Sequence, residues 1–275
     1  MSEAAREYFA LVSSITDTNY RNLLISREDA AARIVLNRPA KRNALSLELM
    51  EEMIAALRDV SGQRDTRAVV IEGAGPAFSA GHDLSEMIGR DRVFLAHLFD
   101  RCSEMMESIR ELPQPVIAKV HGIATAAGCQ LVAACDLAVA AQDTRFATPG
   151  VKIGLFCSTP MVPVSRAVGR KRAMQMLLTG EAVDAGTALE WGLINRVAPA
   201  EQLETAVAEL VDAIARSSAY TVATGKRAFY SQIDRSEEDA YEHCELVMTE
   251  NAFAHDAQEG MTAFLEKRQP VWRGE

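Results

Sequence analysis

The 275-residue sequence predicts an α/β fold, in which short buried strands alternate with amphipathic helices. Two observations predict it: apolar runs of five or six residues recur up to about residue 140, and segments with apolar residues at helical spacing lie between them. From about residue 164 onward the pattern is almost wholly helical. We therefore expect an irregular arm over 1–22, a sheet-containing core over 23–200 and a helical region over 201–275.

The N-terminal half supplies the first strand and helix signals. Apolar runs at 33–37 and 67–72 each predict a strand. Ser46, followed by Glu48 and Glu51, predicts the N-terminus of the helix between them, because such side chains bond to the unpaired N–H groups of a first turn.

The middle of the chain continues the alternation. A helix is expected near 93–112, strands at 115–120 and 136–140, and a helix of small residues over 124–134. Strands that alternate with helices indicate a parallel sheet joined by right-handed crossovers.

The composition limits the kinds of partner that the protein could bind. The net charge of −9 disfavours nucleic acid, so a polyanionic ligand would need local Lys or Arg near it. No apolar run approaches the ~20 residues that cross a bilayer, and Glu3, Arg6 and Glu7 interrupt the N-terminus, so we expect no membrane partner and a cytoplasmic protein. Neither the five cysteines nor the five histidines show metal-ligand spacing, so no metal site is expected.

Two segments have the features of a site. In 76–86 and in 121–136, small residues and a glycine stand where a strand leads into a helix. Small side chains let a ligand approach the backbone, and a helix N-terminus offers unpaired N–H groups. Brought together, two such places would form an oxyanion hole. Close packing of a helix on a sheet explains the same residues, and spacing alone does not decide between the two.

Five sequence stretches resemble the crotonase (enoyl-CoA hydratase/isomerase) superfamily, in its order and spacing. They are NRPAKRNAL (37–45), FSAGHDL (78–84), GIATAAGCQL (122–131), WGLINRV (191–197) and GMTAFLEKR (260–268). The likeness covers about residues 22–275. Two shorter runs, CQLVA (129–133) and GLFCSTP (154–160), resemble one subgroup of that family.

The resemblance implies a fold and a ligand. The fold would be a spiral of ββα turns with a C-terminal helical region that assembles a homotrimer or a dimer of trimers. The ligand would be an acyl-CoA thioester, with coenzyme A as part of the substrate and no separate cofactor. The backbone N–H groups of His82 and Ala127 would hold the thioester oxygen. Family members usually have glycine at the second position, but alanine keeps the N–H group.

The resemblance also places the coenzyme A moiety. It would lie along a set of residues on the first half of the chain: Lys41, Ala44, Ala80, Asp83, Leu84 and Gly128. Phe264 and Lys267 would approach its adenine end, from a neighbouring subunit. Lys41 and Lys267 would supply the local positive charge, although both also fit the pattern of ordinary solvated lysines.

The sequence departs from the family at every usual acid–base position. Gln130 and Gly150 stand where hydratases carry their two glutamates, and Ser158 and Ser103 stand where other members carry an acid and a histidine. Hydration needs a base for water and an acid for the α-carbon, and each such group contributes about 10²–10⁴ in rate. Gln130 can hold a water but exchanges no protons at neutral pH. Efficient hydration by the standard mechanism is therefore not expected.

Three functions stay open at this point. The first is a lyase or isomerase of fatty-acid metabolism that acts weakly or atypically on an enoyl-CoA or acyl-CoA. The second is a catalytically silent acyl-CoA binding protein. The third is a different reaction, isomerisation or thioester cleavage, that uses Ser158, Cys157 or His82. A Cys157 thiolate would need an electropositive neighbour, and the sequence offers none.

Overall fold

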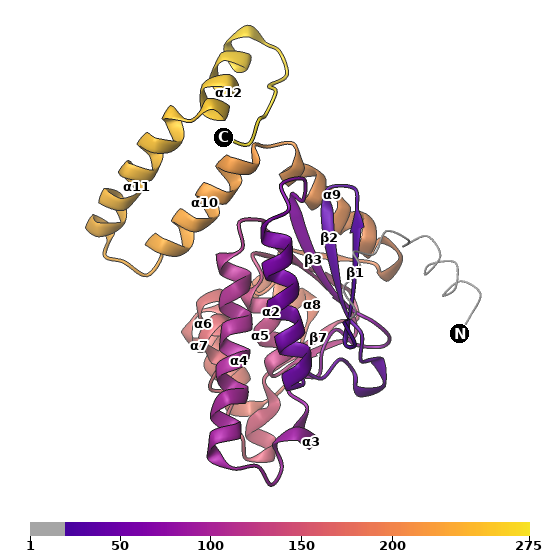
Figure 1. The fold of residues 1–275 in the computed structure, drawn as a ribbon. Helices are drawn as coiled ribbons and strands as arrows, with labels where there is room; N and C mark the ends of the chain where they lie inside the picture. The colour runs from indigo at the N-terminus through magenta and orange to yellow at the C-terminus, as the bar shows by residue number, and fades with distance from the viewer. Residues whose placement is uncertain (1–19) are drawn as a thin grey trace, which may run out of the picture.

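The computed structural model describes residues 20–275, and Figure 1 labels most of its α-helices and some of its strands. Its larger sheet has the strand order β1-β2-β3-β4-β6-β9. β1 runs antiparallel to β2, and each further neighbour in this sheet is parallel. The strands are β1 (Leu23–Glu28), β2 (Ala31–Leu36), β3 (Ala68–Gly73), β4 (Val116–Val120), β6 (Leu137–Ala141) and β9 (Arg196–Ala198).

A smaller sheet receives alternate strands of the chain. It has the order β5-β7-β8, in which β5 and β7 are parallel and β7 and β8 are antiparallel. After each of β4 and β6 the chain crosses to this sheet, and α5 (Ala127–Ala134) then returns it from β5 to the larger one. This is the ββα turn that the resemblance implies. The strands are β5 (Ile123–Thr125), β7 (Arg145–Ala147) and β8 (Val183–Asp184).

Helices cover both faces of the larger sheet, so β3 is buried along its whole length. Val69 and Ile71 of that strand join the main core, while Val70 faces α9 (Leu203–Ala215) on the other side. The main core includes residues of α2 (Leu47–Ser61), α4 (Arg92–Glu111), α5, α6 (Met161–Val168), α7 (Arg170–Thr179) and α8 (Ala185–Trp191). Short helical segments η1 (Pro39–Lys41), η2 (Pro149–Ile153), η3 (Ala200–Gln202) and α3 (Leu84–Met87) lie in the connections.

The last three helices leave the core. In Figure 1, α10 (Ala219–Gln232), α11 (Glu237–Phe253) and α12 (His255–Glu266) extend away from the sheet, and we call them the arm. Large apolar side chains are exposed along it, including Phe229, Ile233, Leu246, Met248, Phe253, Phe264 and Leu265. Among residues 20–275, no helix is both long and apolar enough to cross a membrane.

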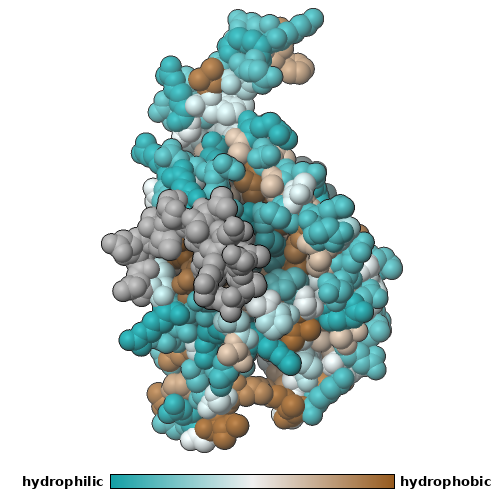
Figure 2. All heavy atoms as spheres, turned by 90° about the vertical axis from the view of Figure 1, so that its right-hand side faces the viewer, coloured by the Kyte–Doolittle hydropathy of each residue, from teal (hydrophilic) through white to brown (hydrophobic). Residues whose placement is uncertain are grey.

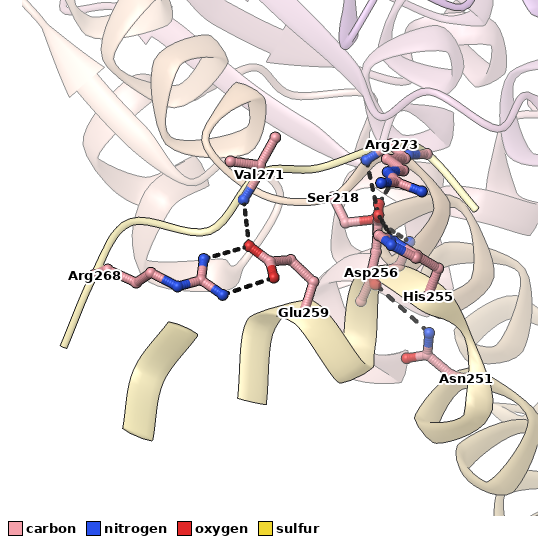
Figure 3. A network of polar contacts seen from close by, with 10 residues as sticks. Ser218, Asn251, His255, Asp256, Glu259, Arg268, Val271 and Arg273 are labelled. Atoms are coloured by element: carbon pink, nitrogen blue, oxygen red, sulfur yellow. Dashed lines mark hydrogen bonds and ion pairs between the residues drawn. The ribbon is translucent and has the colours of Figure 1, made fainter. Parts of the chain in front are cut away.

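The C-terminal residues tie the arm to the core (Figure 3). Asp256 of α12 is buried, and its carboxylate accepts hydrogen bonds from the Ser218 hydroxyl and from the backbone N–H groups of Arg273 and Gly274, at 2.6, 2.8 and 2.9 Å. The Trp272 indole N–H donates to the carbonyl of Arg216, at the end of α9. The chain after α12 therefore folds back onto the corner between α9 and α10.

The predicted α/β fold is confirmed, with local differences. Ser46 caps α2 as predicted, because its hydroxyl accepts a hydrogen bond from the Leu49 N–H. The helix expected over 124–134 starts only at Ala127, because 123–125 pairs with β7. The strands β1, β5, β7, β8 and β9 were not predicted.

The expected arm over 1–22 lies mostly outside the described residues. Only residues 20–22 of this arm are described. There, the backbone N–H groups of Arg21 and Asn22 both donate to the Glu52 carboxylate on α2. These two residues are therefore held against α2, with Asn22 buried and Arg21 exposed.

Candidate active site

The two segments singled out in the sequence lie side by side. The N–H of Ser79 donates to the carbonyl of Ile123 at 3.1 Å, and the N–H of Thr125 donates to the carbonyl of Ser79 at 2.9 Å, so the segments run parallel. His82 and Ala127 follow three residues beyond the paired Ser79 and Ala124.

Gly81 brings the two chains into contact just before His82. It has a φ of +90°, and a Cβ placed on it would lie 3.2 Å from the Ala127 nitrogen and 2.9 Å from the Ala126 Cβ. Such a short approach allows only glycine here. The backbone of 81–82 and the start of α5 are therefore in direct contact.

The amides of His82 and Ala127 have no acceptor among the described residues. Ala127 is the first residue of α5, so its N–H has no partner within the helix. Ala126 before it has φ 51° and ψ −118°, which is left-handed backbone for a residue with a side chain. Such a conformation costs about 1–3 kcal/mol and is typically found where a site requires it.

A cavity of about 460 Å³ is lined by both residues. Its walls are mainly apolar, and none of the described residues that line it is a carboxylate. Its titratable side chains are His82, Lys152 and Cys157, and its remaining walls are Ala80, Leu84, Phe99, Ala126, Ala127, Pro149, Gly150, Ile153, Leu155, Phe156, Ser158, Thr159 and Pro160. Figure 2 shows apolar side chains gathered at the lower end of the molecule, the end that carries α3 in Figure 1.

The His82 side chain is uncharged at neutral pH. Its ring meets Phe99 edge to face at 5.5 Å between centroids, and neither ring nitrogen makes a hydrogen bond although both are buried. Burial lowers the pKa of His82 to about 4, and the carbonyl of Leu45, which is not placed for a full hydrogen bond, opposes this shift only in part. His82 is thus the one neutral base that lines the cavity.

The Gly150 backbone closes one wall of the cavity. The N–H of Leu155 donates to the Gly150 carbonyl at 3.0 Å. A Cβ at position 150 would lie 2.0 Å from the Leu155 oxygen and 2.9 Å from the Cys157 sulfur. No side chain fits here unless the backbone moves.

Cys157 and Ser158 line the cavity without an activating partner. Burial raises the pKa of the Cys157 thiol, although its hydrogen bond with the Gly150 backbone opposes this, so the thiol is protonated at neutral pH. The Ser158 hydroxyl donates to the carbonyl of Phe156 at 3.4 Å. Neither arrangement provides a ready nucleophile.

Gln130 lies elsewhere. It is almost fully buried, and its Oε1 is 3.9 Å from the Cys102 sulfur. It lines a second cavity, of about 680 Å³, between α4, α5, α6 and α10, and so does Ser103. Only Thr159 lines both cavities.

Of the residues expected along coenzyme A, Ala80 and Leu84 line the first cavity. Asp83 is engaged structurally: it pairs with Arg38 at 2.8 Å and caps α3 by accepting from the Ser85 N–H. Burial opposes its ionisation, but the hydrogen bonds from Ser85 and Arg38 hold the pKa of Asp83 below its ordinary value.

The others lie outside the cavity wall. Ala44 is buried and its carbonyl accepts from Arg38, while Lys41 is exposed at the end of η1. A Cβ on Gly128 would lie 2.3 Å from the Ser79 carbonyl oxygen. Close packing of the helix on the neighbouring chain therefore explains this glycine.

Phe264 and Lys267 lie far from the cavity of the same chain. Phe264 is 83% exposed on α12, and Lys267 follows at the end of that helix. α12 is at the opposite end of the molecule from α3 in Figure 1. Any contact with the site has to come from another copy.

Lys152 is the charged residue among the wall residues that the sequence did not single out. It lies two residues after Gly150, and its aliphatic Cε would lie 3.2 Å from a Cβ on Gly180. An isolated lysine in a surface segment carries no sequence signal of its own, so the fold was needed to find it. In the described chain, no group of three or more His, Cys, Asp or Glu side chains could hold a metal ion.

The α/β spiral has a counterpart among solved structures and known families. Residues 26–275 match the family described as enoyl-CoA hydratase/isomerase. The chain belongs to this family.

The relatives are similar over nearly the whole chain. Enoyl-CoA hydratase domain-containing protein 3 of Rattus norvegicus is 46% identical, over 90% of this chain and 82% of the relative. The crystal structure of the human protein of that name is 44% identical with a TM-score of 0.90, over 92% of this chain and all of the other. A Mycobacterium smegmatis enoyl-CoA hydratase structure is 47% identical with a TM-score of 0.89, over 91% of this chain and 98% of the other. The predicted subgroup is that of enoyl-CoA hydratase domain-containing protein 3, and the likeness of the chain to it is confirmed.

The same comparison corrects the expected location. The rat, human and other vertebrate relatives, 44–46% identical, are named as mitochondrial proteins, so the expectation of a cytoplasmic protein is wrong. That expectation depended on Glu3 and Glu7, and a few terminal charges are a weak basis for assigning a compartment.

Proposed function

We propose that the chain binds an acyl-CoA thioester with its carbonyl oxygen held by the N–H groups of His82 and Ala127. The observation that carries this proposal is that both amides lack an acceptor within residues 20–275 and both residues line one apolar cavity. Donors fixed in advance around a developing oxyanion lower the barrier of acyl chemistry, since they need no reorganisation as charge appears. The positive end of α5 adds to this effect.

Coenzyme A would be held outside the cavity as part of the substrate, with no separate cofactor. Lys152 at the wall and Lys41, four residues before the Leu45 that pairs with His82, would supply positive charge in a protein of net charge −9. Phe264 and Lys267 would contribute from a neighbouring copy. The exposed apolar side chains of the arm support a homotrimer or a dimer of trimers.

The reaction would be weak or atypical within the hydratase/isomerase family. None of the residues that line the cavity is a carboxylate, and Gly150 leaves no room for one. Because each missing acid or base costs about 10²–10⁴ in rate, hydration by two carboxylates is replaced by a slower process. The uncharged His82 is the group best placed to move a proton, which favours isomerisation over thioester cleavage by Cys157 or Ser158.

A second candidate is a catalytically silent acyl-CoA binding protein, which the acid-free wall also favours. Hydration of crotonyl-CoA, followed by its absorbance, separates the two. If the protein binds crotonyl-CoA but hydrates it no faster than buffer does, the result supports the catalytically silent binding protein.

The binding claim is tested by removing one donor. Ala127→Pro deletes the N–H at the first position of α5, where proline suits a helix. We expect a folded variant whose affinity for acyl-CoA falls by roughly tenfold or more, the loss of one strong hydrogen bond. Arg92→Pro, at the first position of α4 and away from the cavity, is the matched control. Unchanged affinity in a folded Ala127→Pro variant, by calorimetry and thermal melting, would contradict the proposal.

A further inference from the structure

Lys152 places a primary amine in the wall of the candidate active-site cavity. It lines the same space of about 460 Å³ as His82 and Ala127. The side chain is exposed, so it stands at the open side of that space. Its aliphatic stem runs past Gly180, where a Cβ would lie 3.2 Å from the Lys152 Cε. Within residues 20–275 its amine makes no ion pair and no hydrogen bond, so the amine is free to meet a ligand.

The other nucleophiles of this wall are held back. Burial raises the pKa of the Cys157 thiol, which keeps it protonated at neutral pH. The Ser158 hydroxyl donates to the Phe156 carbonyl at 3.4 Å. Lys152 is thus the wall nucleophile that has no competing partner in the described chain.

An acyl thioester in this cavity would meet that amine in an activated form. Two N–H donors on the carbonyl oxygen stabilise the negative charge that develops there when a nucleophile attacks the carbon. A lysine amine attacks in its neutral form, a minor fraction at neutral pH, and confinement beside the carbonyl offsets that small fraction. His82 lines the same cavity, is uncharged and has neither ring nitrogen bonded, so a base for the released proton is also present.

We propose that Lys152 is acylated by the thioester that the cavity binds. The amine nitrogen forms a bond to the carbonyl carbon, the carbon–sulfur bond breaks, and one proton passes from the nitrogen to the sulfur. The products are an N-acyl lysine and free coenzyme A. This inference rests on the proposed function and adds a stoichiometric acyl transfer to it. Acylation removes the charge of Lys152 and leaves the acyl group at the open side of the cavity, which weakens binding of a second thioester.

Mass spectrometry of the full chain after incubation with butyryl-CoA tests the proposal. Peptide mapping gives the acylation rate of each lysine in one sample, so Lys171 serves as an internal reference: it is exposed on α7 and makes no ion pair in the described part of the chain. We expect Lys152 to be acylated at least roughly tenfold faster than Lys171, because only Lys152 lies beside the held carbonyl. Lys152→Arg should remove the fast adduct from the intact mass, and the matched control Lys171→Arg should keep it.

Ala127→Pro links the adduct to the site. With one donor removed, the rate at Lys152 should fall toward that at Lys171. A Lys152 rate that stays at the wild-type value in the folded variant would overturn the inference, since the acylation would not depend on the held carbonyl.

The wild-type protein alone separates the remaining outcomes. Equal rates at Lys152 and Lys171, with butyryl-CoA bound by calorimetry, would overturn the inference while leaving the proposed function intact. If butyryl-CoA does not bind, the proposed function and this inference are both wrong.

Discussion

The carbonyl oxygen of Leu155 occupies the space that a side chain at Gly150 would need, since a Cβ there would lie 2.0 Å from it. The Leu155 N–H also bonds to the Gly150 carbonyl at 3.0 Å, so the segment is fixed from both sides. Position 150 is where the family resemblance expects a glutamate. Restoring that acid therefore requires a different path of the backbone as well as a different residue.

Gly150→Ala should destabilise the protein. The added methyl group meets backbone and the Cys157 sulfur, so we expect a loss of about 1–3 kcal/mol in the free energy of unfolding. Gly225→Ala is the matched control, because a Cβ there meets nothing within 4 Å and α10 should gain about 0.5–1 kcal/mol. Urea denaturation measures both, and an equal effect of the two substitutions would contradict the steric explanation.

Gln130→Glu should give a pH-dependent loss of stability without hydratase activity. The new carboxyl would be buried beside Cys102, which disfavours its charged form and raises its pKa above that of an exposed glutamate. Its folded pKa then exceeds its unfolded pKa, so stability is retained at low pH and lost as the pH rises through the folded pKa. Unfolding midpoints at about pH 4.5 and about pH 7.5, compared with wild type, check the sign. A hydration rate far above wild type would show that one acid suffices.

His82 should make the protein less stable in acid. Burial lowers its pKa to about 4, below the unfolded value of 6.5, so its contribution is complete above pH 6.5 and is lost as the pH falls toward 4. The difference between the two pKa values corresponds to a contribution of roughly 3 kcal/mol at most to the free energy of unfolding, and partial solvent contact reduces this contribution. His82→Phe, which keeps an aromatic contact with Phe99, should remove this part of the pH dependence. An imidazole that titrates near its ordinary pKa by NMR would contradict the prediction.

Asp256→Ala should release the C-terminal residues. The substitution leaves the Ser218 hydroxyl and the N–H groups of Arg273 and Gly274 without their acceptor, and we expect a cost of about 2–3 kcal/mol. Limited proteolysis should then cut after α12 more readily. Glu245→Ala, on the exposed surface of α11, is the control and should cut at the wild-type rate. Equal protection of the two variants would mean that the tail is held by other contacts.

Sequence reasoning succeeded where the signal is local. The cap at Ser46 and the buried strand at 68–73 follow from side chains within a few residues of each other. The two-residue strand β8 exists only through its pairing with β7, so no local pattern reveals it. β1 was missed because its burial does not alternate cleanly.

The site shows the same division. Placing His82 and Ala127 together depended on family resemblance, while the wall formed by Gly150 and the position of Lys152 depend on how distant segments pack. Spacing left two explanations open for the small residues of 121–136, a ligand site and close helix packing, and each explanation applies at a different position. Gly128 permits close packing, and Ala127 leaves its amide free of an internal partner.

α10 has two structural roles, and a substitution in this helix affects both. Phe229 and Ile233 line the second cavity, and the same helix is the root from which the arm leaves the core. A substitution selected to change how copies of this chain associate would therefore also reshape the space beside Thr159. The association of copies and the shape of that cavity are therefore coupled through one helix.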